Sequence, residues 1–148
     1  MNQKIEIRVI KPEETYPIRH FVLRPNQMLK NCVYPGDQDV STFHLGAFYE
    51  GKLVGIASYY LEGNPEFKEE TQYRLRGMAT LTEYRGMEAG KQLIREAEKI
   101  MKNRGAELWW CNARTSASGF YEKLGLSVHG EVFDIDPIGP HKMMVRNL

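Results

Sequence analysis

A basic turn that contains two glycines precedes the clearest helix of this sequence. A strand-like apolar stretch passes into residues 85–91, Arg-Gly-Met-Glu-Ala-Gly-Lys, and an amphipathic segment follows. The first N–H groups of a helix have no partner inside it and lie at the positive end of its dipole, so they attract anions. Arg85 and Lys91 add full positive charges, and Gly86 and Gly90 let a ligand approach the backbone closely. The turn therefore predicts a site for an anion such as a diphosphate.

The same turn also has a purely structural interpretation. Gly86 would then be only a turn residue, and Gly90 would only permit close helix packing. Residues 85–91 are neither a Walker loop, which requires Gly-Lys-Ser/Thr, nor a dinucleotide fingerprint with three glycines. Taken alone, the turn leaves both interpretations open.

A second stretch whose side chains could take part in a reaction is residues 108–126, which include Asn112 and Phe-Tyr-Glu-Lys-Leu-Gly-Leu. Ala117, Phe120 and Leu124 share one face of its predicted helix. Tyr121 lies beside that face, and its side chain can point toward the preceding sheet. Its phenol can donate a proton to a departing thiolate. The alternative is an ordinary amphipathic aromatic residue with its hydroxyl at the surface.

The helices and strands that must position these residues are predicted from hydrophobic periodicity and from the positions of proline and glycine. A helix opens at Pro12 and ends or kinks at Pro25, because proline suits a first turn and breaks an interior. Residues 29–40 are predicted to form a loop. Two further helices cover 87–104, with Gly105 as its left-handed cap, and 116–124. The predicted strands are 5–10, 42–49, 53–60, 72–81, 107–113, 126–135 and 142–145.

This order predicts the fold class. The passage from a strand through the 87–104 helix to another strand implies a parallel pair with a crossover. The leading hairpins imply antiparallel strands. A mixed α/β sheet with helices on both faces is therefore expected.

Length, charge and cysteine content restrict the class of protein. A chain of 148 residues is expected to be a single domain, residues 1–148. The net charge of +1 provides no field for holding nucleic acid or an acidic membrane, and no membrane-spanning run or signal peptide is recognised. Cys32 and Cys111 have no metal or redox spacing, and the four histidines have no ligand spacing, so no metal is expected. Reduced thiols in a cytoplasmic protein are predicted.

The two chemical stretches, in this order, resemble the GNAT-type N-acetyltransferase superfamily. Its first hallmark, Arg/Gln-x-x-Gly-x-Gly/Ala after a strand, matches residues 85–90, and its second, Asn followed by Ala and then Phe-Tyr-Glu-Lys-Leu-Gly-Phe, matches Asn112, Ala117 and residues 120–126. Leu126 replaces the usual phenylalanine. The resemblance covers essentially the whole chain. It implies a mostly antiparallel central sheet of six to seven strands with a splayed parallel pair.

The resemblance also implies the use of acetyl-CoA and the residues that contact it. The Met78 N–H would polarise the thioester carbonyl, Asn112 would bond to the pantetheine, and Tyr121 would protonate the leaving CoA thiolate. The acceptor amine would attack directly, without a covalent enzyme intermediate. The implied contact residues are Met78, Ala79, Thr80, Arg85, Gly86, Met87, Glu88, Ala89, Gly90, Lys91, Asn112, Ser118 and Tyr121.

Glu88 departs from the superfamily pattern, because it stands where the first motif glycine is usual. A carboxylate near two phosphates repels them. If the side chain points to solvent, the site survives with weaker binding. If it points inward, CoA binding is lost. Glu88 and the lack of an acid on the strand before the motif also leave open a second interpretation, a CoA-binding module or sensor without transfer activity. A binding protein for another phosphorylated ligand is a third interpretation.

The acceptor and the general base are less well defined. A small or peptidyl primary amine is the expected acceptor, and related proteins often form homodimers. Alternation on the strand before the motif places Arg74, Arg76 and Met78 on one face. The two arginines either bind an acidic group of the substrate or pair with surface carboxylates. His141 is in the loop between the last two strands, which often borders the acceptor site in related enzymes, and the alternative is a structural loop histidine. The base is left unassigned among His141 and the glutamates flanking the strand: Glu69, Glu70 and Glu83.

Overall fold

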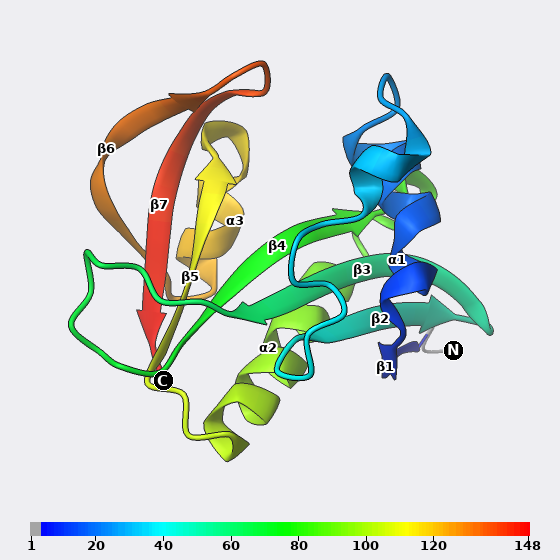
Figure 1. Ribbon diagram of the computed structural model, residues 1–148. Helices are drawn as coiled ribbons and strands as arrows, with labels where there is room; N and C mark the ends of the chain where they lie inside the picture. Colours follow the sequence, from blue (N-terminus) through cyan, green and yellow to red (C-terminus); the bar gives the residue numbers. More distant parts are fainter. Residues whose placement is uncertain (1–3) are drawn as a thin grey trace.

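Residues 4–148, which this computed structural model describes, contain one seven-stranded sheet in the order β1-β2-β3-β4-β5-β7-β6 (Figure 1). Its neighbouring strands are antiparallel except β4 and β5, which run parallel. The predicted mixed, mostly antiparallel sheet is therefore confirmed. The strands are β1 (Ile5–Ile10), β2 (Phe43–Tyr49), β3 (Lys52–Leu61), β4 (Gln72–Thr80), β5 (Leu108–Arg114), β6 (Ser127–Ile135) and β7 (Gly139–Asn147).

Helices cover both faces of the sheet, as expected. Helix α1 (Pro12–Ile18) continues into a π-helical turn at Arg19–Leu23, and its Ile18 packs with Ile56 and Ala79 on one face. Helix α2 (Ala89–Asn103) lies on the other face, where its apolar stripe joins the main core (Figure 1). The short helix α3 (Ser118–Lys123) adds Tyr121 to that same core. None of the described helices is long and apolar enough to span a membrane.

Strands β4 and β5 separate partway along their length. They pair from Gln72 opposite Leu108 to Arg74 opposite Trp110, and pairing ends there. Just beyond, β4 contains a bulge, because its register against β3 shifts between Ser58 and Ile56. Gly77 lies in this bulge with a φ of 67°, a left-handed value that favours glycine. The splayed parallel pair implied by the sequence is present.

Several element boundaries differ from the sequence prediction. Helix α2 begins at Ala89 rather than at residue 87, because Glu88 adopts a left-handed φ of 63°. Strand β7 begins at Gly139, since pairing with β6 extends it through Gly139 and Pro140, residues typical of a turn. A short 3-10 helix, Leu29–Cys32, lies inside the predicted loop. Both cysteines are buried and free, and Gly105 has the predicted left-handed conformation.

Candidate active site

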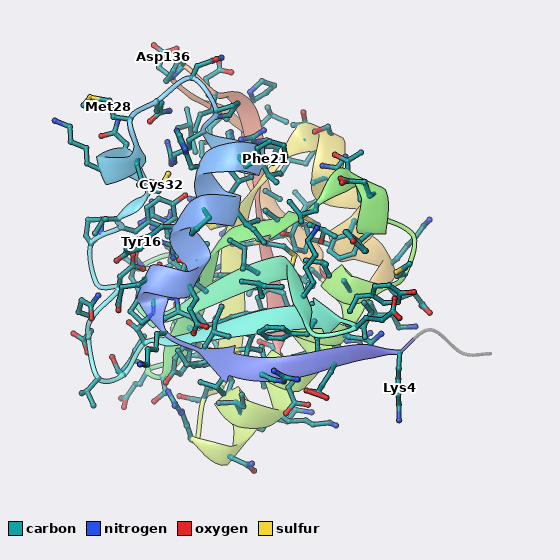
Figure 2. The ribbon with its side chains drawn as sticks, turned by 90° about the vertical axis from the view of Figure 1, so that its right-hand side faces the viewer. Lys4, Tyr16, Phe21, Met28, Cys32 and Asp136 are labelled. Atoms are coloured by element: carbon teal, nitrogen blue, oxygen red, sulfur yellow. The ribbon has the colours of Figure 1, made fainter. Side chains whose placement is uncertain are left out.

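Two cavities meet between the splayed strands, the π-helical turn at Arg19–Leu23, the start of α2, and α3. The first has a volume of about 740 Å³ and the second about 580 Å³. Residues that line both include Met78 on β4 and Tyr121 on α3. The second cavity reaches the end of the molecule where the segment around Met28 and the turn at Asp136 both lie (Figure 2).

The basic turn lines the first cavity, so the residues predicted to bind an anion are brought together there. Arg85, Gly86, Glu88, Ala89, Gly90 and Lys91 border it beside Ala79 and Thr80 of β4. Gly86 has a φ of 91°, which turns the chain into the start of α2. The first N–H groups of this 15-residue helix lie at the cavity wall, with two side-chain cations beside them.

Two residues of the predicted anion-binding turn also have packing roles. A Cβ on Gly90 would lie 3.0 Å from the Phe120 ring, so glycine lets α2 and α3 approach without a shift of that ring. Met87 packs against the main core rather than lining either cavity in the described part of the chain. Gly90 therefore permits close helix packing, as the structural interpretation expects, and it also lines the first cavity.

Tyr121 lies at the junction of the two cavities. Its hydroxyl is 3.7 Å from the Met78 Sδ, and its side chain is buried. The alternative that places this hydroxyl at the surface is therefore wrong. Burial raises the pKa of Tyr121, and the nearby Cys111 thiol adds to this shift. The phenol thus keeps its proton, which is the state that a proton donor requires.

Asn112 lies on β5 where the strand has separated from β4. Its Oδ1 is buried and has no hydrogen-bond partner among the described residues, and the residue lines the second cavity. An orphaned buried carbonyl is costly and suits a ligand that brings an N–H group. The Ser118 hydroxyl is already engaged, because it donates to the Thr115 carbonyl at 2.9 Å.

The two arginines predicted on β4 differ in their surroundings. Arg74 forms an ion pair with Glu62 at 3.0 Å and lies over the Trp110 ring, so it pairs with a carboxylate. Arg76 lies over the Tyr34 ring and lines the second cavity. Met78 does not share their face. The bulge at Gly77 inserts one residue and turns Met78 toward the main core, which corrects the simple alternation expected from sequence.

His141 also lines the second cavity, on β7 opposite Arg114 of β5. Its ring is buried, and its Nδ1 lies 2.7 Å from the Gly139 carbonyl oxygen. A carbonyl only accepts, so Nδ1 carries the hydrogen. In the neutral ring, Nε2 is therefore the nitrogen that can accept a proton.

Arg24, Tyr34 and Arg114 line the second cavity and were not predicted as site residues from the sequence. Tyr34 belongs to a predicted loop that carried no chemical signal beyond an aromatic residue before Pro-Gly-Asp. It is buried because its N–H donates to Asp37 Oδ2 at 2.8 Å, and Asp37 is itself bound by the fully buried Arg19 at 2.7 Å. These partners lie too far apart in the chain for spacing to reveal them.

The sequence matches a model of the acetyltransferase (GNAT) family over residues 6–126. It is 46% identical over 144 residues to a protein of Bacillus subtilis (strain 168) named "Uncharacterized N-acetyltransferase YitI", covering 97% of each chain. A second protein of that organism, named "Putative acetyltransferase BSU40680", is 31% identical over 103 residues, which are 70% of this chain and 65% of that protein.

Solved structures share the fold. A putative N-acetyltransferase from Lactobacillus plantarum superposes with a TM-score of 0.78 at 21% identity, covering 97% of this chain and 98% of that one. An aminoglycoside 6'-N-acetyltransferase complexed with coenzyme A superposes with a TM-score of 0.77 at 14% identity, covering 96% of each. At these identities the likeness concerns the fold alone.

Proposed function

This chain belongs to the acetyltransferase (GNAT) family, and from that premise we propose that it transfers the acetyl group of acetyl-CoA to a primary amine by direct attack. One observation carries the proposal. The buried Tyr121 hydroxyl and Met78 lie together where a cavity lined by the N-terminus of a helix meets a second cavity. A two-substrate reaction requires such a junction, because its two ligands must meet at one point.

The residues present fit coenzyme A. Arg85, Lys91 and the first N–H groups of α2 would hold the pyrophosphate, since they place positive charge at the first cavity. The orphaned Asn112 Oδ1 would accept an amide N–H of the pantetheine arm in the gap between β4 and β5. Bound acetyl-CoA supplies an activated acetyl group and a thiolate leaving group. Ser118 is weaker support, because its hydroxyl already donates to Thr115.

Three groups of the chain would carry the chemistry. The Met78 backbone N–H would donate to the thioester carbonyl oxygen, where negative charge develops. Tyr121 would give its proton to the departing sulfur. His141 would accept a proton from the substrate ammonium through Nε2, because Nδ1 is held by Gly139, and the neutral amine then attacks the thioester carbonyl. The His141 assignment is favoured over the flanking glutamates, since no carboxylate lines the second cavity within residues 4–148.

Calorimetry with acetyl-CoA and CoA, paired with a Tyr121→Phe variant, tests this function. We expect micromolar binding, about −8 kcal/mol, for both proteins. Turnover with a panel of primary amines should fall about 10²–10⁴-fold in Tyr121→Phe, because the proton donor is removed. Tyr49→Phe, on β2, is the matched control with unchanged turnover.

Each failure has a distinct meaning. Unchanged turnover in Tyr121→Phe would show that Tyr121 is not the proton donor. Binding of CoA without transfer to any amine would favour the non-catalytic module. If neither acetyl-CoA nor CoA binds, the proposed function is wrong, although the fold is unaffected.

A further inference from the structure

The second cavity is strongly cationic. Five arginines line it, and no aspartate or glutamate does so among the described residues. They are Arg24, Arg74, Arg76, Arg85 and Arg114. A protein with a net charge of only +1 therefore concentrates positive charge at one place. Such a cavity attracts anions and repels cations.

Two of these arginines are available for a ligand other than CoA. Arg74 is neutralised by Glu62 at 3.0 Å. Arg85 and Arg114 also line the first cavity, where the pyrophosphate is proposed to bind. Arg24 and Arg76 line only the second cavity, and neither has a carboxylate within 4.0 Å in the part of the chain that the structure describes.

Tyr34 holds both of these guanidinium groups. The Arg76 guanidinium carbon lies 4.7 Å from the Tyr34 ring centroid and that of Arg24 lies 5.3 Å from it, and Arg24 Nε also donates to the Tyr34 hydroxyl at 3.2 Å. The ring faces attract cations and so orient them. Tyr34 is fixed in turn by the Asp37–Arg19 pair. The two cations are thus positioned before any ligand arrives.

The charge of Arg76 is poorly compensated by the protein itself. Burial lowers the pKa of Arg76, and the neighbouring Arg74 lowers it further. An arginine nevertheless stays protonated under ordinary conditions. An anion beside it would offset the desolvation and form charge-assisted hydrogen bonds with its planar donor groups.

We propose that the acceptor amine carries a second, anionic group, a carboxylate or a phosphate, which binds between Arg24 and Arg76. The amine end then lies toward Tyr121 and His141 in the same cavity. This inference rests on the proposed function, because it names the substrate class of that site. It excludes polycationic amines, which the five arginines would repel.

Matched acceptor pairs test the inference. 4-Aminobutyrate is compared with n-butylamine, and O-phosphoethanolamine with ethanolamine, by the initial rate of CoA release. We expect kcat/KM to be at least about 30-fold higher for one or both anionic members, the scale set by a buried charge pair. The pair with the larger ratio distinguishes a carboxylate from a phosphate. Equal values within both pairs would overturn the inference.

Variants connect the preference to the two arginines. In Arg76→Met and Arg24→Met, the ratio of kcat/KM for the anionic acceptor to kcat/KM for the neutral acceptor should fall to within about threefold of unity. The fall should come from a higher KM for the anionic acceptor. The kinetics with the neutral acceptor and the affinity for CoA should be unchanged. Arg8→Met removes an exposed cation on β1 and is the control with an unchanged ratio. Equal losses for charged and neutral acceptors would overturn the inference. If Arg76→Met does not fold, the same kcat/KM ratio measured in Arg76→Lys and Arg24→Met tests the inference instead.

A binding measurement separates this inference from the proposed function. The complex with CoA is titrated with 4-acetamidobutyrate and, in parallel, with N-butylacetamide. Tighter binding of the anionic compound that is lost in Arg76→Met supports the inference even if no amine is acetylated. Equal binding of the two compounds, or no binding of either, overturns it. Failure to bind CoA overturns the proposed function instead.

Discussion

The Glu88 carboxylate lies 3.6 Å from the Lys91 ammonium, and both side chains are largely exposed. Glu88 makes this contact from a left-handed backbone with a φ of 63°, at the residue just before α2. Its side chain therefore neutralises one of the cations at the first cavity while the backbone turn is preserved. The left-handed conformation also explains why glycine suits this position.

Replacement of Glu88 should affect CoA binding and stability separately. Glu88→Gly and Glu88→Gln both remove the carboxylate, so we expect about five- to tenfold tighter CoA binding at low salt from reduced repulsion. Only Glu88→Gly relieves the left-handed strain, and it should raise the free energy of unfolding by about 0.5–1 kcal/mol. Calorimetry and urea unfolding measure the two effects. Weaker CoA binding by both variants would contradict the repulsion argument.

His141 should be required for turnover if it removes the amine proton. His141→Gln is expected to lower kcat about 10²–10⁴-fold with CoA affinity unchanged, and added imidazole should restore part of the rate. His129→Gln is a matched control, because His129 is on β6 and pairs with Glu66 at 3.3 Å. A change of less than about twofold in kcat for His141→Gln would leave the base elsewhere.

A side chain at Gly77 should destabilise the protein. Its φ is 67°, and an added Cβ would lie 3.2 Å from the Tyr34 ring and 3.3 Å from Arg19 Nε. Gly77→Ala is expected to lower the free energy of unfolding by about 1–3 kcal/mol and to displace Tyr34. Gly63→Ala is the control, since a Cβ there meets nothing within 4 Å. Urea unfolding gives both values, and equal stability of the two variants would be inconsistent with the bulge geometry.

Stability should decline as the pH falls below about 6.5, the ordinary histidine pKa. Burial lowers the pKa of His44, which is held neutral with Nδ1 2.7 Å from Ser58 Oγ and Nε2 3.0 Å from the Asp37 carbonyl oxygen. The unfolded chain binds this proton more readily, so the contribution of His44 is full above pH 6.5 and is lost as the pH falls toward and through its lower folded pKa. His44→Gln should flatten that part of the stability profile. An unchanged slope would contradict this origin.

A second decline should begin below about pH 4. Burial alone would raise the pKa of Asp37, but hydrogen bonds from Arg19, Tyr60 and the Tyr34 N–H outweigh it and lower the pKa. The resulting stability is full above the ordinary aspartate pKa of about 3.9 and is lost as the pH falls through the lower folded value. Asp37→Ala should cost about 3–5 kcal/mol at pH 7, because it leaves Arg19 buried and unpaired. Loss of less than about 1 kcal/mol would mean that Arg19 finds another partner.

The features that the sequence predicted correctly are mostly local. The helix after the basic turn follows from its apolar stripe, and Gly105 ends it in a left-handed cap. The strand order follows from periodicity and turn residues. Tyr121 could be placed on a short helix after β5, because one face of that helix is apolar. Helix starts, caps and amphipathic faces depend on neighbouring residues, so short-range patterns record them.

The remaining features depend on contacts between distant segments. Alternation on β4 misplaced Met78, since only pairing with β3 reveals the bulge at Gly77. Strand β7 extends back to Gly139 because β6 pairs with it there. The cluster of Arg24 and Arg76 around Tyr34 forms only when a loop, a π-helical turn and β4 meet over the buried Arg19–Asp37 pair. The sequence by itself determined the helices, the strands and the family, whereas tertiary packing decided which charges share a cavity. Contacts between distant segments produce no periodic pattern in the sequence from which they could be predicted.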